Sequence, residues 1–195
     1  MTSAYKDVVM IGGPNGAGKT TAAATLLPKM LGIREFVNAD EIAGGLSPFN
    51  PEGRALAAGR LMIERMHELV ARGESFAFES TCAGRAHVQT LLKCRDAAYR
   101  FILIFLWLPS AKEALRRVAR RVAQGGHSIP DDVVIRRYAA GLKNLQQLYL
   151  PIADIAYIYD NTDQGGILIA ERQPGQTLMV CDDRRWKRIL EANRD

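Results

Sequence analysis

Short apolar segments alternate along the chain with longer stretches whose apolar residues recur at helical spacing. The apolar segments, at 7–11, 35–38, 75–79, 101–108 and 155–159, are typical of buried strands. The stretches between them predict helices at 21–29, 51–73, 85–97, 110–124 and 131–148. Strands that alternate with helices form parallel sheets. The pattern therefore predicts an α/β protein with a mostly parallel sheet and helices on both faces.

The last part of the chain breaks this alternation. Segments 167–170 and 177–180 flank Pro174-Gly175 and predict a hairpin at the sheet edge, followed by a short helix from Asp182. Turn residues fill segment 44–51, which predicts a loop. At 195 residues, without repeats or a long linker, we expect a single domain over 1–195. Within it we place a helical lid at about 116–148, and the hairpin and helix at about 165–195.

One stretch between the first strand and the first helix carries specific chemistry. Gly13-Pro14-Asn15-Gly16-Ala17-Gly18-Lys19-Thr20 fits the P-loop (Walker A) pattern G-x-x-x-x-G-K-[ST] without a gap. Its glycines let backbone amides surround an anion, and the helix start adds a positive dipole end. Lys19 supplies a charge for the β- and γ-phosphates, and Thr20 supplies a hydroxyl for Mg²⁺. The alternative, a glycine turn that binds nothing, leaves the strand and helix context unexplained.

The sequence therefore predicts a nucleoside triphosphate, ATP, and Mg²⁺ as ligands. The predicted nucleotide contacts are Gly13, Pro14, Asn15, Gly16, Ala17, Gly18, Lys19, Thr20 and Thr21.

Two acids follow short predicted strands, Asp40 after 35–38 and Glu79 at the end of 75–79. The carboxyl ends of parallel strands meet at one edge, so we expect both acids beside the phosphate loop. Phosphoryl transfer to a hydroxyl needs a base and a carboxylate that acts on Mg²⁺, directly or through water. We assign Asp40 as the base, and Thr20 and Glu79 to the metal. Alternatively, the two acids have only structural roles, and Asp40 is the N-cap of the helix that follows.

The segment from Arg116 to Arg137 concentrates arginines in the predicted lid. At about 100° per residue, Arg117 and Arg121 lie at the edge of an apolar stripe, and Arg137 does so in the next helix. We predict that these three contact phosphate, while Arg116, Arg120 and Arg136 face solvent. The glycines of the intervening 125–130 segment suit a lid hinge, and His127 is a candidate phosphate contact. The alternative is a solvated basic face.

Composition narrows the classes of function. Hydrophobic residues at 48% and charged residues at 24% are ordinary for a soluble globular protein. No apolar run reaches the roughly 20 residues that span a membrane, and the N-terminus lacks a signal-peptide pattern. Three cysteines without metal spacing favour reduced thiols in a cytoplasmic protein. A net charge of +5 suits anionic substrates, and the clustering of the arginines argues against a nucleic-acid partner.

The combination of motifs resembles the zeta-toxin-like P-loop kinases over about residues 5–165. The matching segments are the phosphate loop, 38–43, 78–81, 121–122 with 125–127, and 159–161. The resemblance implies an α/β three-layer P-loop kinase fold that uses ATP and Mg²⁺ to phosphorylate a sugar hydroxyl of UDP-N-acetylglucosamine. It implies catalytic roles for Lys19, Asp40, Glu79 and the lid arginines Arg117, Arg121 and Arg137. One chain alone does not identify an antitoxin partner.

Three other interpretations compete with this one. ABC transporter ATPases share the phosphate-loop sequence, but the LSGGQ-type signature is missing and strand 101–108 ends in Pro109-Ser110 instead of Asp-Glu. A kinase for another small hydroxylated metabolite would use the same catalytic residues. A nucleotide-dependent switch or nucleic-acid-associated ATPase would fit the basic charge. The sequence leaves the acceptor open, and residues 46–54 and 82–89 are expected to face it.

Overall fold

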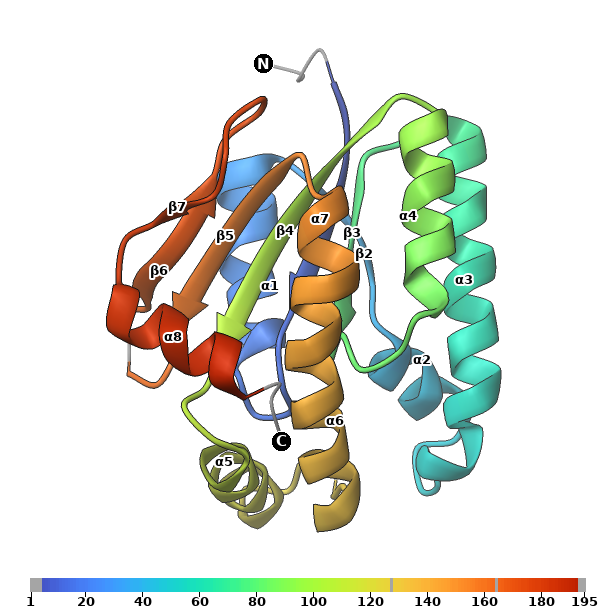
Figure 1. Ribbon diagram of the computed structural model, residues 1–195. Helices are drawn as coiled ribbons and strands as arrows, with labels where there is room; N and C mark the ends of the chain where they lie inside the picture. Colours follow the sequence, from blue (N-terminus) through green and yellow to red (C-terminus); the bar gives the residue numbers. More distant parts are fainter. Residues whose placement is uncertain (1–4, 127, 164, 193–195) are drawn as a thin grey trace.

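The computed structural model describes residues 5–126, 128–163 and 165–192, which form a seven-stranded sheet in the order β2-β3-β1-β4-β5-β6-β7 (Figure 1). Neighbouring strands from β2 to β5 pair in parallel, whereas β6 and β7 are antiparallel. The strands are β1 (Lys6–Gly12), β2 (Glu35–Val37), β3 (Phe76–Ser80), β4 (Tyr99–Trp107), β5 (Ile155–Asp160), β6 (Ile167–Arg172) and β7 (Met179–Val180). The predicted parallel sheet and edge hairpin are confirmed.

Helices connect the parallel strands, as the hydrophobic pattern predicts. They are α1 (Lys19–Leu26) with a π-helical turn η1 (Leu27–Leu31), α2 (Ala39–Leu46), a 3₁₀ turn η2 (Glu52–Arg54), α3 (Ala55–Arg72), α4 (Ala86–Asp96), α5 (Ala111–Ala123), α6 (Asp131–Asn144) with a π-helical turn η3 (Leu145–Tyr149), α7 (Leu150–Ile152) and α8 (Asp183–Glu191). Within the described ranges, every helix is too short or too polar to cross a bilayer.

The helices cover the two faces of the sheet unequally. On β4, Tyr99 and Trp107 share one face because side chains alternate along a strand. The Tyr99 hydroxyl donates to the Leu69 carbonyl of α3 at 3.3 Å, and Arg188 of α8 lies 5.2 Å from the centroid of the Trp107 ring. Helix α1 lies behind the sheet in Figure 1, whereas α6 and α8 lie in front of it. One face therefore carries α3, α6 and α8, and α1 covers the other.

Strands β1 and β4 form the centre of the core. Every residue of β1 after Lys6 is buried, and so is every residue of β4 except Arg100. This burial on both faces explains why segment 101–108 is almost wholly apolar. The rigid centre places the carboxyl ends of β1, β3 and β4 side by side, with Gly12 level with Ser80 on one neighbour and Phe105 on the other.

The structure differs from the sequence prediction after β2, where the predicted turn segment 44–51 begins inside helix α2. The Asp40 N–H donates to the Asn38 side chain at 2.8 Å, which makes Asn38 the N-cap. Burial of Ala43 and packing of Ile42 on the core support the helix, and Gly44 and Gly45 form its last turn. The interpretation of Asp40 as an N-cap is therefore wrong, because Asp40 lies in the first turn instead.

Thiol chemistry tests this packing. All three cysteines are free; Cys82 and Cys94 are buried, whereas Cys181 is exposed. Burial raises the pKa of Cys82 to about 12 and that of Cys94 to about 11, and the thiolate is the reactive form. We expect an aromatic disulfide reagent to modify one thiol rapidly in the native protein and all three in denaturant. A Cys181→Ser variant should lose the fast phase, and a second fast thiol in the native protein would contradict the fold.

Candidate active site

The phosphate loop links β1 to α1 by a backbone path that requires glycine. Gly13, Gly16 and Gly18 have φ angles of 142°, 77° and 85°. A Cβ at Gly13 would lie 2.3 Å from the Leu106 carbonyl oxygen, and one at Gly16 would lie 2.9 Å from the Arg117 Cβ. Close packing against β4 and α5 therefore excludes side chains at these two positions. The loop has the shape that the motif predicts.

A cluster of polar side chains surrounds the carboxylate of Glu79 at the end of β3. The Lys19 ammonium donates to the Pro14 carbonyl at 3.0 Å and lies 3.6 Å from Glu79 Oε1. The Thr20 hydroxyl donates to Glu79 Oε2 at 2.7 Å, and the Asn38 amide donates to the same oxygen at 3.1 Å. One carboxylate thus contacts the starts of α1 and α2, which follow β1 and β2.

The electrostatics of this cluster depend on burial. The Lys19 and Glu79 side chains are only 6% and 11% exposed. Burial lowers the pKa of the Lys19 ammonium, while the negative charges of Glu79 and Asp40 oppose that shift. Asp40 itself is exposed, in the first turn of α2. The structure therefore brings together four of the predicted site residues, Lys19, Thr20, Asp40 and Glu79.

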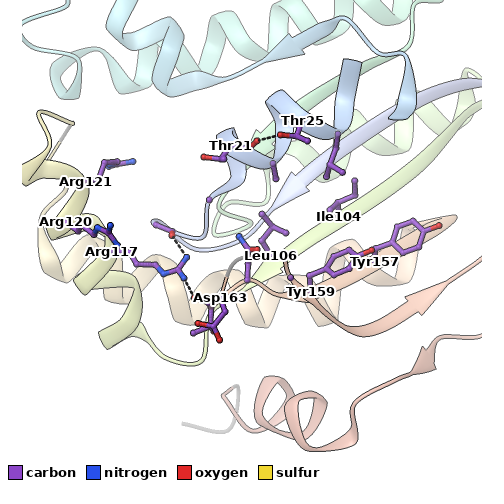
Figure 2. A pocket seen from close by; sticks show the side chains of 18 of the residues that line it. Thr21, Thr25, Ile104, Leu106, Arg117, Arg120, Arg121, Tyr157, Tyr159 and Asp163 are labelled. Atoms are coloured by element: carbon purple, nitrogen blue, oxygen red, sulfur yellow. Dashed lines mark hydrogen bonds between the residues drawn. The ribbon is translucent and has the colours of Figure 1, made fainter. Parts of the chain in front are cut away.

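A cavity of about 1340 Å³ opens on the other side of the phosphate loop, between α1, α5 and the strands β4 and β5 (Figure 2). Its lining near the loop includes Gly16, Gly18, Thr21, Arg117, Arg121 and Asn161. Further along, Ile104, Leu106 and the stacked rings of Tyr157 and Tyr159 form an apolar wall. A cavity above the usual 300–1,000 Å³ of small-molecule sites has room for a complete nucleoside triphosphate.

The arginines lie on the helix faces that the sequence predicts. Arg117, Arg121 and Arg137 are half-buried, whereas Arg116, Arg120 and Arg136 are exposed. Among the described residues, the cavity lining includes Arg117 and Arg121 but not Arg137, and it also includes Arg116 and Arg120, which the sequence predicts to face solvent. His127 lies outside the described residues. The contacts of the three predicted arginines with phosphate remain predictions.

Arg117 makes protein contacts that the sequence did not predict. Its guanidinium donates to Glu113 Oε1 at 3.0 Å, to the Gly16 carbonyl at 3.3 Å and to the Thr162 carbonyl. Figure 2 shows the side chain reaching from α5 between the phosphate loop and the chain after β5. Arg117 therefore ties α5 to both segments.

Two asparagines complete the site, although the sequence pattern predicted a role for neither of them. Asn38 caps α2 and contacts Glu79, while the Asn161 amide donates to the Ala17 carbonyl at 2.7 Å. Both residues directly follow a strand, β2 or β5. The position after a parallel strand is itself a signal, because functional side chains gather at the carboxyl ends of such strands.

The strand order, the glycine-rich loop after β1 and the carboxylates after β2 and β3 define a P-loop kinase-like domain. A family model described as AAA domain matches residues 8–147. The chain belongs to this AAA domain family. An uncharacterized protein of Haemophilus influenzae is 29% identical over 126 residues, which cover 65% of this chain and 88% of that protein.

Solved structures share the fold at low sequence identity. A chain in the complex of AvrRxo1-ORF1 and AvrRxo1-ORF2 with sulphate ions has a TM-score of 0.76 and 16% identity. The match covers 96% of this chain but only 64% of the length of that chain. A chain of the PezAT toxin–antitoxin system of Streptococcus pneumoniae has a TM-score of 0.66 and 14% identity, covering 100% of this chain and 90% of that chain. These likenesses establish the fold.

Removing the Glu79 carboxylate should destabilise the protein, because the Lys19 charge would remain buried without its partner. We expect Glu79→Ala to lower the free energy of unfolding by about 3 kcal/mol, measured by urea denaturation. Removing the exposed carboxylate in Glu64→Ala should change it by less than about 0.5 kcal/mol. Adding Lys19→Met to Glu79→Ala should recover part of the loss. Equal stability of Glu79→Ala and wild type would contradict the pairing.

Proposed function

We propose that the protein is an ATP- and Mg²⁺-dependent kinase of the zeta-toxin type. It transfers the γ-phosphate to a hydroxyl of a small metabolite, with UDP-N-acetylglucosamine as the first candidate acceptor. The observation that carries the proposal is the cluster of buried Lys19 with Thr20, Glu79 and Asp40 beside a loop shaped for phosphate. The likeness to a chain of a toxin–antitoxin system supports the toxin type, and an antitoxin-like protein is then a candidate partner.

The nucleotide would lie across the phosphate loop with its nucleoside in the large cavity. Amides of the loop and the start of α1 supply positive potential for the phosphates, to which Lys19 adds a full charge. The Lys19 ammonium, which contacts the Pro14 carbonyl and Glu79, is held within the loop. Thr21 and Asn161 line the part of the cavity next to the loop and suit the sugar and the nearest phosphate.

The oxygen ligands beside the phosphate loop fit Mg²⁺. The Thr20 hydroxyl and Glu79 carboxylate are 2.7 Å apart, and Mg²⁺ in nucleotide sites is held by one or two protein oxygens together with phosphates and water. Among the described residues there is no group of three or more His, Cys, Asp and Glu that could hold a metal without a nucleotide. Bound there, Mg²⁺ would neutralise charge on the transferring phosphate.

The environments of the two acids separate their roles. The Glu79 side chain is only 11% exposed, and its carboxylate accepts hydrogen bonds from Thr20 and Asn38, so that it is suited to hold the site together. Asp40 is exposed on α2 yet close enough to interact with the Lys19 charge. An acceptor hydroxyl can reach Asp40, which supports Asp40 as the residue that takes its proton.

The first test of this function is incubation of the protein with Mg-ATP and UDP-N-acetylglucosamine, followed by detection of a phosphorylated sugar nucleotide by mass. Lys19→Ala removes the charge at the phosphates, and Asp40→Asn removes the base while preserving its size. We expect each variant to lower kcat by about 10²- to 10⁴-fold. Glu41→Gln, which removes the neighbouring exposed carboxylate of α2, should retain wild-type activity.

The outcomes separate the parts of the proposal. ATP binding without this product, but with transfer to another hydroxylated metabolite, would refute UDP-N-acetylglucosamine and keep the kinase. ATP hydrolysis stimulated by a macromolecule, without any phosphorylated small molecule, would refute the kinase and favour a nucleotide-dependent switch. Full activity of Asp40→Asn would refute Asp40 as the base.

The lid arginines give a second test, because arginines that contact the transferring phosphoryl group stabilise its developing charge. We expect Arg121→Ala and Arg137→Ala to lower kcat by at least about 10²-fold in the assay that detects product. Lys112→Ala and Arg136→Ala remove an exposed positive charge from the same two helices, outside the cavity lining, and should stay within about twofold of wild type. Similar effects at all four positions would indicate a general contribution of basic charge instead.

A further inference from the structure

The carboxylate of Asp160, the last residue of β5, is the centre of a hydrogen-bonded group that the proposed chemistry does not use. Asp160 is only 7% exposed. It accepts hydrogen bonds from the Thr162 N–H at 2.9 Å and from the Thr162 hydroxyl. Nε of Arg185, from the C-terminal helix α8, donates to its other oxygen at 2.8 Å. Arg185 also pairs with Asp182, which caps α8.

Residues 160–163, here called the β5 loop, form one wall of the large cavity. Asn161, Thr162 and Asp163 all line it, and Figure 2 shows Asp163 at its rim near Arg117. The loop is joined to the phosphate loop at two points. Asn161 donates to the Ala17 carbonyl, and the Arg117 guanidinium bridges the Thr162 and Gly16 carbonyls. The backbone of the phosphate loop therefore rests on the β5 loop.

We propose that Arg185 and Asp160 are positioning residues for nucleotide binding. Their ion pair holds the β5 loop in the conformation that supports the phosphate loop and shapes the wall of the cavity. The inference rests on the proposed binding of ATP at this site. It gives the C-terminal helix, which lies beyond the family match at residues 8–147, a role in that site.

The burial of the pair explains why the loop conformation depends on it. Burial on its own raises the pKa of the Asp160 carboxyl, but hydrogen bonds from Thr162 and Arg185 outweigh it and leave the pKa below its ordinary value. Asp160 is therefore a buried negative charge. Without Arg185, this charge must find water or protonate, and either change disturbs the Thr162 contacts that orient the loop. Arg117 would then lose its fixed acceptor at the Thr162 carbonyl.

The test measures ATP binding directly by isothermal titration calorimetry, so that it does not depend on the acceptor. Arg185→Ala should raise the Kd for Mg-ATP about tenfold. This is the effect expected when one charge-assisted hydrogen bond that orients the site is lost. Arg185→Lys, which keeps the charge, should bind within about threefold of wild type. The matched control is Arg184→Ala, which removes an exposed arginine from the same helix and should leave Kd unchanged.

Thermal unfolding of the free proteins separates positioning from stability alone. A lower Tm with an unchanged Kd in Arg185→Ala would overturn the proposal, because a purely structural pair would behave in this way. If Arg185→Ala does not fold, Asp160→Asn provides the same test, since Asn retains an acceptor for Thr162 but lacks the charge that pairs with Arg185. Wild-type Kd in that variant would also overturn the proposal. Failure of the wild-type protein to bind ATP would instead refute the proposed function itself.

Discussion

The contact between the buried ammonium of Lys19 and the carboxylate of Glu79 is the interaction on which the rest of the site depends. A lysine that is 6% exposed needs a nearby negative charge, and Glu79 at the end of β3 supplies it. The same carboxylate accepts from Thr20 and Asn38, so that it sets the spacing between the ends of β1, β2 and β3. The parallel register of the sheet makes this possible, because it brings Gly12 and Ser80 level with each other.

The unequal covering of the sheet divides the site into two sides. Helix α1 covers its face in part and leaves the cavity against β4 and β5, where Ile104 and Tyr159 form an apolar wall. Asp40 and the first turn of α2 lie by contrast near the Lys19 charge, at the β2 and β3 end of the loop. For the proposed kinase, this arrangement lets a nucleoside and an acceptor hydroxyl approach the phosphate loop from opposite sides, as in-line transfer requires.

Arginine serves more than one purpose in this protein. Arg117 and Arg185 both hold the chain around the large cavity, the first through backbone carbonyls and the second through a buried carboxylate. A planar guanidinium with several donors can join two or three acceptors at once, which a lysine cannot do in the same way. The concentration of arginines on α5 therefore reflects architecture as well as affinity for phosphate. Arg121, half-buried on the same helix and lining the cavity, remains a candidate for direct phosphate contact.

Local periodicity and short motifs were enough to predict the order of strands and helices, the phosphate loop, and the acids that follow β2 and end β3. They did not predict helix α2, because Gly44 and Gly45 disfavour a helix locally, while the Asn38 cap and the burial of Ala43 outweigh that preference. Only the tertiary structure showed that Asn161 contacts Ala17, and that Arg185 contacts Asp160 from 25 residues away. Such contacts depend on how distant elements pack against each other. The spacing of residues along the chain does not predict that packing.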